Sequence, residues 1–270
     1  MTKKRSRIVL VVLLVAVVGG LAWQVTRPRE PMYQAKPLTY WLQGYNQSPR
    51  YNQPPPLGSV TESQADEAVR QTGTNAIPTL LRLLVAKESV FTRRIVELSQ
   101  KQHVIKIGYT PAWERTGQAI HAFSCLGASA KAAVPTLITM YEQDHVGNSR
   151  SAIAVALGAI GPAAATAVPL LIQGINNTNS WVRLGYIQSL GHLHAEPALV
   201  VPALVRALPD PNTRVRCTAV ETLGTFGADA RQAVPALVEL LSNRSIDVRW
   251  AATNALKAID PEAAARAGVN

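Results

Sequence analysis

Histidine and carboxylate side chains are the groups with which this chain could carry out acid–base chemistry or hold a metal ion. His192 and His194 lie two residues apart, so a helix would direct them to different sides. His121 lies in an apolar stretch, where we expect a hydrogen-bonded core or groove histidine. The sequence contains no Gly-rich phosphate loop, no G-x-S-x-G motif and no H-E-x-x-H motif. We therefore predict no catalytic, metal or cofactor site, and a protein that is not an enzyme.

Arginine recurs at a fixed spacing, every 33 residues, at Arg150, Arg183, Arg216 and Arg249. A ladder of guanidinium groups could bind an acidic partner. The sequence favours a structural role instead, in which each arginine bonds a carboxylate or the end of a helix. Asp247 beside Arg249 and Asp210 near Arg216 are the expected partners.

A proline motif recurs with nearly the same period. Its prolines are separated by 57, 34, 33 and 33 residues, at Pro78, Pro135, Pro169, Pro202 and Pro235. Two markers with one period indicate a stacked array of repeats. Proline fits the first turn of a helix but breaks its interior, so each proline predicts the start of one helix. A second helix follows a short polar turn and is predicted to end at a glycine, as at Gly224.

The repeated pattern V-R-x-x-A-x-x-x-L-G, then G-x-x-A, then V-P-x-L, resembles the short bacterial HEAT repeat of about 33 residues, a type also found in phycobilin-lyase-like HEAT families. The match is best at Val215–Gly224 and at Val248–Leu256, where Lys257 replaces the glycine. The resemblance covers about residues 61–260. It implies an all-α fold, a right-handed α-solenoid of helix pairs, and implies no particular activity.

The array is predicted to be irregular at both ends. Residues 61–72 indicate a single helix that caps the N-terminal end, and residues 261–270 form a C-terminal tail. The long first period places an insertion at about 87–113, and residues 87–106 carry five basic and two acidic side chains. Such insertions often form functional loops, but we favour an extra packed helix with a basic solvent face.

The N-terminal segment combines a basic flank, Lys3–Arg7, with the uncharged apolar run Ile8–Trp23. This pattern directs membrane insertion with the flank on the cytoplasmic side. We predict that residues 1–26 form the flank and a single transmembrane signal anchor in a bacterial inner membrane. The array would then lie in the periplasm or outside. The alternative is a cleaved signal peptide, with secretion after cleavage near Ala22.

Residues 27–60 are rich in proline and are predicted to be a tether. Within them, Leu38–Leu42 is an apolar cluster for which two interpretations are open. It docks as a short helix on the membrane or the first repeat, or it is a hydrophobic segment of the linker.

The net charge of +10 belongs mainly to the N-terminal part of the chain. Lys3, Lys4, Arg5 and Arg7 supply four of these charges, and residues 27–60 supply three more. From residue 61 onward there are 19 basic and 16 acidic residues. A repeat body so close to neutral opposes binding of nucleic acid.

Helical solenoids commonly bind partners on a concave face lined by their second helices. Taking the recurring arginine as the reference, the positions one, five and nine residues later are predicted to face outward there. The candidate partner-binding residues are Leu184, Gln188, His192, Cys217, Glu221, Trp250 and Asn254. We predict a non-catalytic, membrane-tethered scaffold that binds a protein or peptide, with no small-molecule substrate. The alternatives are a lyase or enzyme-accessory subunit of phycobilin-lyase-like type, and a nucleic-acid-binding HEAT-like protein.

Overall fold

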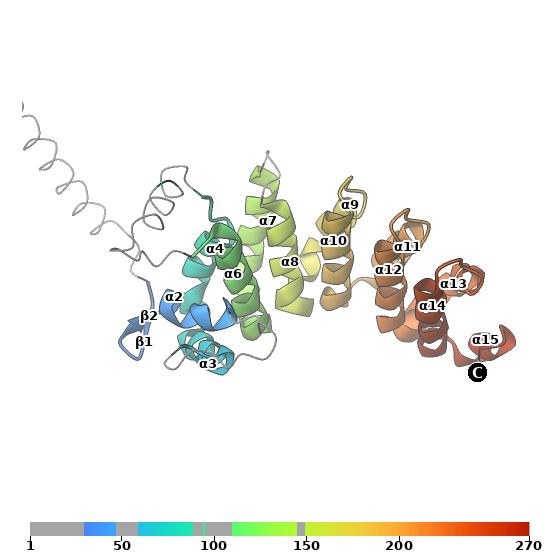
Figure 1. The fold of residues 1–270 in the computed structure, drawn as a ribbon, viewed down its shortest axis with the longest axis horizontal. Coiled ribbons are helices and arrows are strands. Elements are labelled where there is room, and N and C mark those ends of the chain that lie inside the picture. The colour runs from blue at the N-terminus through green and yellow to red at the C-terminus, as the bar shows by residue number, and fades with distance from the viewer. Residues whose placement is uncertain (1–29, 47–58, 89–93, 95–109, 145–148, 270) are drawn as a thin grey trace, which may run out of the picture.

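The structure is a computed structural model that describes residues 30–46, 59–88, 94, 110–144 and 149–269. Paired helices stack side by side in one elongated row, from α3 (Glu62–Thr72) at one end to α15 (Pro261–Arg266) at the other (Figure 1). One apolar core runs through the row, with alanine, leucine and valine as its main constituents. The prediction of an all-α solenoid is therefore confirmed.

The first helix of each pair follows the recurring proline motif. These helices are α4 (Ile77–Leu84), α7 (Val134–Gln143), α9 (Val168–Gly174), α11 (Pro197–Ala207) and α13 (Val234–Leu240). In all except α11 the proline occupies one of the first two positions, where the missing N–H costs no hydrogen bond. Short 3-10 segments lead into these four helices: η2 (Gly73–Ala76), η3 (Gly127–Ala133), η4 (Gly161–Ala167) and η5 (Gly227–Ala233).

Helix α11 differs from this pattern because it begins at Pro197 and contains Pro202 in its interior. The predicted start at Pro202 is therefore wrong for this repeat. Glu196, with φ of +50°, turns the chain directly into the helix, and no 3-10 segment precedes it. A second proline thus provides an earlier start than the repeat pattern indicates.

The second helices pack against one another in chain order along the row. They are α6 (Ala112–Leu126), α8 (Arg150–Ile160), α10 (Ser180–Leu193), α12 (Thr213–Thr225) and α14 (Ile246–Ile259). Small residues permit this close packing. A Cβ atom added to Gly224 would lie 3.3 Å from the Cα atom of Ala255 on α14. Gly224 is the penultimate residue of α12, so the predicted helix end is one residue early. The chain turns instead at Gly227, where φ is +53°.

Three of the recurring arginines close the turn before their own helix. Arg183, Arg216 and Arg249 each donate from Nη1 to the carbonyl oxygens six and five residues earlier, at 2.7–3.3 Å. The structural role predicted for the ladder is confirmed for these three. Arg216 does bond Asp210, but through the main-chain carbonyl oxygen, because the Asp210 carboxylate pairs with Arg183 of the preceding repeat. The predicted partner of Arg249 is wrong, because Arg249 bonds turn carbonyls rather than Asp247.

Residues 30–46 are folded onto the first repeat. The hairpin of β1 (Met32–Tyr33) and β2 (Lys36–Pro37) leads into α2 (Leu38–Trp41) and the 3-10 helix η1 (Leu42–Asn46). The side chains of Leu38, Trp41 and Leu42 are buried, and η1 packs against both α3 and α6. The predicted tether is therefore wrong for residues 30–46. Of the two interpretations of Leu38–Leu42, the short helix docked on the first repeat is confirmed.

Both ends of the row carry capped helices. At the start of α3, the Thr61 hydroxyl accepts from the Gln64 backbone N–H at 3.3 Å, and the Gln64 side chain accepts from the Thr61 backbone N–H at 3.0 Å. At the other end, the Asp260 carboxylate accepts from the N–H of Ala263, which is buried with Ala264. Residues 261–266 thus form α15, packed on α14, and the predicted tail at 261–270 is wrong over this range.

The predicted anchor at residues 1–26 lies outside the described residues, as does most of the predicted insertion at 87–113. Two described stretches, Ala112–Gln143 and Arg150–Gly174, are long and apolar enough to cross a membrane by length and composition. Each stretch consists of a second helix, a 3-10 segment that begins at a glycine with positive φ, and the next first helix. The apolar side chains of both stretches therefore form part of the core between repeats.

Candidate functional site

The candidate partner-binding residues do not form the uniform lining that the sequence predicts. Gln188, His192, Glu221 and Asn254 are exposed, and Cys217 is half-buried. Trp250 is 65% exposed, whereas Leu184 is only 6% exposed. The prediction is therefore wrong for Leu184. Its helix α10 lies between α8 and α12 and packs against both, whereas α14 has a second helix on one side only.

Two exposed tryptophans lie on second helices in the C-terminal half of the array. Trp181, in the first turn of α10, is 68% exposed, a value close to that of Trp250 on α14. Between them, the guanidinium of Arg214 on α12 lies 5.3 Å from the centre of the Trp181 ring. Cys217 and Glu221 lie on the same helix, one and two turns after Arg214. We call Trp181, Arg214, Cys217, Glu221 and Trp250 the tryptophan face.

The Cys217 thiol is the nucleophilic group of the tryptophan face. Burial raises the pKa of the Cys217 thiol, and the nearby carboxylates of Glu221 and Asp247 raise this pKa further. Because the thiolate is the reactive form, a raised pKa makes Cys217 a weak nucleophile near neutral pH. The chemistry of this face is therefore that of apolar, aromatic and charged contacts.

The histidines take roles that the sequence predicts only in part. His121 is exposed, stacks on the Tyr45 ring at 5.4 Å between centres and lines a surface pocket with it, so the predicted core position is wrong and the groove position is confirmed. His194 ends α10 in the left-handed region with φ of +44° and stacks on Phe226. Within the described ranges, no group of three or more histidine, cysteine or carboxylate side chains is placed to hold a metal ion.

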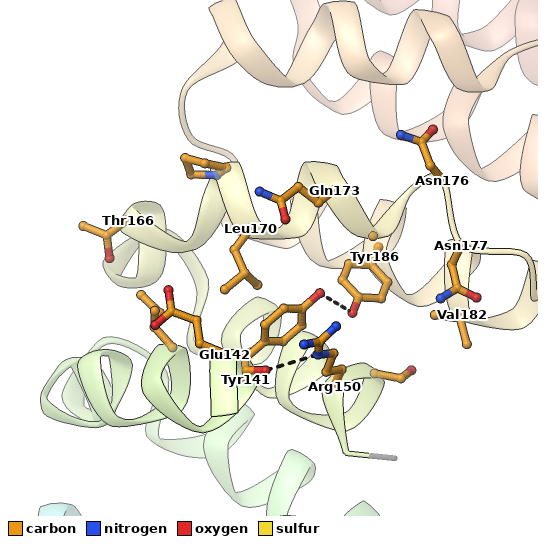
Figure 2. A pocket seen from close by; sticks show the side chains of 14 residues that line it. Tyr141, Glu142, Arg150, Thr166, Leu170, Gln173, Asn176, Asn177, Val182 and Tyr186 are labelled. Atoms are coloured by element: carbon orange, nitrogen blue, oxygen red, sulfur yellow. Dashed lines mark hydrogen bonds between the residues drawn. The ribbon is translucent and has the colours of Figure 1, made fainter. Parts of the chain in front are cut away.

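A polar pocket between α7, α8, α9 and α10 was not anticipated from the sequence. Tyr141 and Tyr186 meet in it, with their hydroxyl oxygens 2.8 Å apart, and Arg150 lies beside them (Figure 2). Both tyrosines are buried, at 8% and 2% exposure. Burial raises the pKa of the Tyr186 hydroxyl, and its hydrogen bond with Tyr141 raises that pKa further, so the hydroxyl stays protonated. A position-by-position comparison of the repeats would have indicated this site, because the aligned residues are aliphatic.

Comparison with known proteins finds a repeat family that matches part of the chain. The family model of HEAT repeats matches residues 168–233 and 201–267. The crystal structure of an engineered protein is 19% identical, with 76% of this chain and 94% of that chain covered and a TM-score of 0.43. The complex of CpcE and CpcF of phycocyanin lyase from Nostoc sp. is 20% identical, with 89% of this chain and 82% of that chain covered and a TM-score of 0.41. These TM-scores are too low to inform function. No curated protein matches the sequence.

Proposed function

Because this chain contains HEAT repeats, we propose that it is a non-catalytic scaffold that binds a protein or peptide along its second helices. The single observation that carries the proposal is the exposure of Trp181 and Trp250, which are 68% and 65% exposed on α10 and α14. Large aromatic side chains are usually at least half-buried, and those left in solvent are frequently the anchors of an interface.

The surroundings of the two tryptophans support a binding role. Ile246, in the first turn of α14, is also exposed, at 69%. It extends the apolar surface toward the turn that precedes α14. The Arg214 guanidinium beside Trp181 and the exposed Glu221 carboxylate supply charges of both signs. This combination of aromatic anchors with mixed charges suits an amphipathic protein segment.

The proposal includes a membrane location. The support for it is the basic flank and apolar run of residues 1–26, which predict a signal anchor. In this arrangement the array faces the periplasm or the outside of a bacterial inner membrane. Extraction of native membranes with alkaline carbonate tests it, because an anchored chain stays in the membrane pellet. A chain recovered in the medium, shortened by about 22 residues, would instead support cleavage near Ala22.

The binding function is tested by affinity capture with the full chain, extracted from native membranes in mild detergent. The test variant is Trp181→Ala/Trp250→Ala. The matched control is Trp113→Ala, since Trp113 on α6 is 72% exposed and lies outside the tryptophan face. Circular dichroism checks that each variant is folded. Removing two anchor side chains is expected to reduce capture at least about tenfold, whereas the control keeps it.

Two outcomes would contradict the proposed binding surface. Equal capture by the double variant and the unaltered chain would place the partner elsewhere on the protein. Equal loss of capture in the folded double variant and in the folded Trp113→Ala control would show that any exposed tryptophan mediates capture, and that this face has no specific role.

A further inference from the structure

The pocket between the second and third proline-led repeats has the size of a ligand site and a mainly polar lining. Its volume is about 760 Å³, within the range of small-molecule sites. It lies between the C-terminal ends of α7 and α9 and the N-terminal ends of α8 and α10. Figure 2 shows Tyr141, Arg150, Gln173 and Tyr186 around this space.

The pocket is built where the chain departs from its own repeat pattern. Counted from the recurring proline, Tyr141 occupies a position that is aliphatic in the other pairs, at Leu84, Ile175, Leu208 and Leu241. Counted from the recurring arginine, Tyr186 is aligned with Ile153, Ala219 and Ala252. At these two positions the chain has a hydroxyl-bearing tyrosine where the other repeats have an aliphatic core residue. Departures of this kind are typical of functional sites.

Gly174 makes the second of these departures possible. It is the last residue of α9, and a Cβ atom added to it would overlap the Tyr186 ring. The aligned residues in neighbouring repeats are Met140, Ala207 and Leu240, each of which has a Cβ. The glycine and the tyrosine therefore depend on each other, and together they place the Tyr186 hydroxyl in the pocket.

Arg150 is bonded differently from the other arginines of the ladder. Its Nε donates to the carbonyl oxygen of Tyr141 at 3.2 Å, and its guanidinium lies 5.2 Å from the centre of the Tyr141 ring. Arg183 uses Nη1 and Nη2 for turn carbonyls and the Asp210 carboxylate. In the part of the chain that the structure describes, the Nη1 and Nη2 groups of Arg150 have no hydrogen-bond or ion-pair partner. They form a planar fork of N–H donors at the pocket wall.

The tyrosine pair adds a further donor. One hydroxyl donates to the other across 2.8 Å, so the accepting hydroxyl keeps its own hydrogen for a ligand. A guanidinium fork with a neighbouring hydroxyl donor is suited to two oxygen atoms in one plane, the geometry of a carboxylate.

The charged residues of the lining indicate whether a phosphate or a carboxylate fits the pocket better. Among the described residues, Arg150 and Glu142 are the charged ones that line the pocket, so the formal charge of this part of the lining is balanced. Either anion would meet the Arg150 cation and the Glu142 carboxylate, and Glu142 repels a singly charged carboxylate less than a doubly charged phosphate. Ile138, Leu170 and Val182 supply apolar surface elsewhere in the lining of the same pocket.

We propose that this pocket binds a carboxylate attached to a small aliphatic group, held by the Arg150 fork and the tyrosine hydroxyl pair. Two sources share this chemistry, namely the C-terminus of a peptide and a free aliphatic acid. The proposal does not depend on the tryptophan face, because that face lies on α10, α12 and α14 and the lining residues lie between α7 and α10.

The test is a titration of the full chain in detergent, followed by the ¹H–¹⁵N resonance of the Arg150 side-chain Nε. The probes are N-acetyl-leucine for a peptide C-terminus, 4-methylpentanoate for a free acid, and N-acetyl-leucine amide as the uncharged control. Arg150→Gln removes the fork, and its binding is followed by the backbone resonances of α9. Tyr186→Phe removes one hydroxyl but keeps the ring, and Arg231→Gln on the exposed part of η5 is the matched surface control.

We expect at least one acid to bind about tenfold more tightly than the amide, because charge-assisted hydrogen bonds are lost with the amide. Arg150→Gln should weaken binding at least about tenfold, and Tyr186→Phe about threefold, with Arg231→Gln unchanged. Binding of N-acetyl-leucine alone would assign the peptide source, and binding of 4-methylpentanoate the free acid. Equal binding of acid and amide, retention by folded Arg150→Gln, or no binding of either acid would each overturn the proposal.

Discussion

Replacing Gly174 by alanine is expected to destabilise this protein, although alanine ordinarily favours helices. The added Cβ overlaps the Tyr186 ring, which is packed in the core and only 2% exposed. Overpacking of this kind costs about 1–3 kcal/mol. Displacing the ring also breaks the hydrogen bond to Tyr141, which costs about 1 kcal/mol more. The gain in helix propensity offsets at most about 1 kcal/mol, so the net loss is about 2 kcal/mol.

The assay is urea and thermal unfolding of the full chain by circular dichroism, with hydrogen exchange to locate the loss. A change of about 2 kcal/mol should lower Tm by about 4–8 °C in a fold of this size. Contacts in a repeat array are mainly between neighbours, so faster exchange should concentrate in α9 and α10.

A double-mutant cycle separates the overlap from a general effect at Gly174. Tyr186→Ala alone should cost about 3–5 kcal/mol, because it leaves a cavity. In that background, Gly174→Ala should be neutral or stabilising by up to about 1 kcal/mol, since the ring is gone. The next repeat already carries alanine at both aligned positions, Ala207 and Ala219. Equal destabilisation by Gly174→Ala in both backgrounds would refute the placement of Tyr186 against Gly174, and with it the construction of the pocket.

Four further substitutions test other parts of the fold. Asp210→Ala removes the carboxylate of an ion pair whose two side chains are 12% and 10% exposed, and should cost about 1.5–3 kcal/mol by urea unfolding. Glu262→Ala, in an exposed pair, should change stability by less than about 0.5 kcal/mol in the same assay. Thr61→Ala removes the α3 capping box and should cost about 1 kcal/mol, seen as a lower urea midpoint. Glu221→Gln lowers the pKa of the Cys217 thiol by removing a negative neighbour, so alkylation of Cys217 at pH 8 should be faster, as followed by mass spectrometry.

Local chemistry decides which helix boundaries the sequence predicts correctly. Most proline-led helices are found as expected, because the restriction that proline places on φ acts within its own residue. Pro202 is the exception, since Pro197 starts the same helix five residues earlier. Gly224 and Gly227 are equally plausible helix ends in the sequence. Only the packing of α12 on α14 shows that Gly224 provides a close approach while Gly227 makes the turn.

The candidate site is less predictable from the sequence than the helix boundaries are, because the exposure of each side chain depends on the neighbouring repeats. Leu184 and Trp250 occupy the same position in the repeat, yet one is buried and the other is exposed. Position in the row, between two second helices or beside one, is a tertiary property that the repeat pattern does not contain. Tyr141 and Tyr186 were detectable by aligning the repeats, but their hydroxyl contact requires α7 and α10 to meet in the fold.

The docking of residues 30–46 on the first repeat limits how far the array can stand from a bilayer. With a membrane anchor that ends at Thr26, as proposed, only residues 27–29 lie between the lipid and the folded body. Three residues extend over at most about 11 Å, whereas a flexible chain covering all of residues 27–60 would have a root-mean-square span of about 30 Å. Such an anchor would hold the first repeat close to the headgroups. Trp250 on α14, near the far end of the row (Figure 1), would then reach partners at a distance from the bilayer that the length of the array determines.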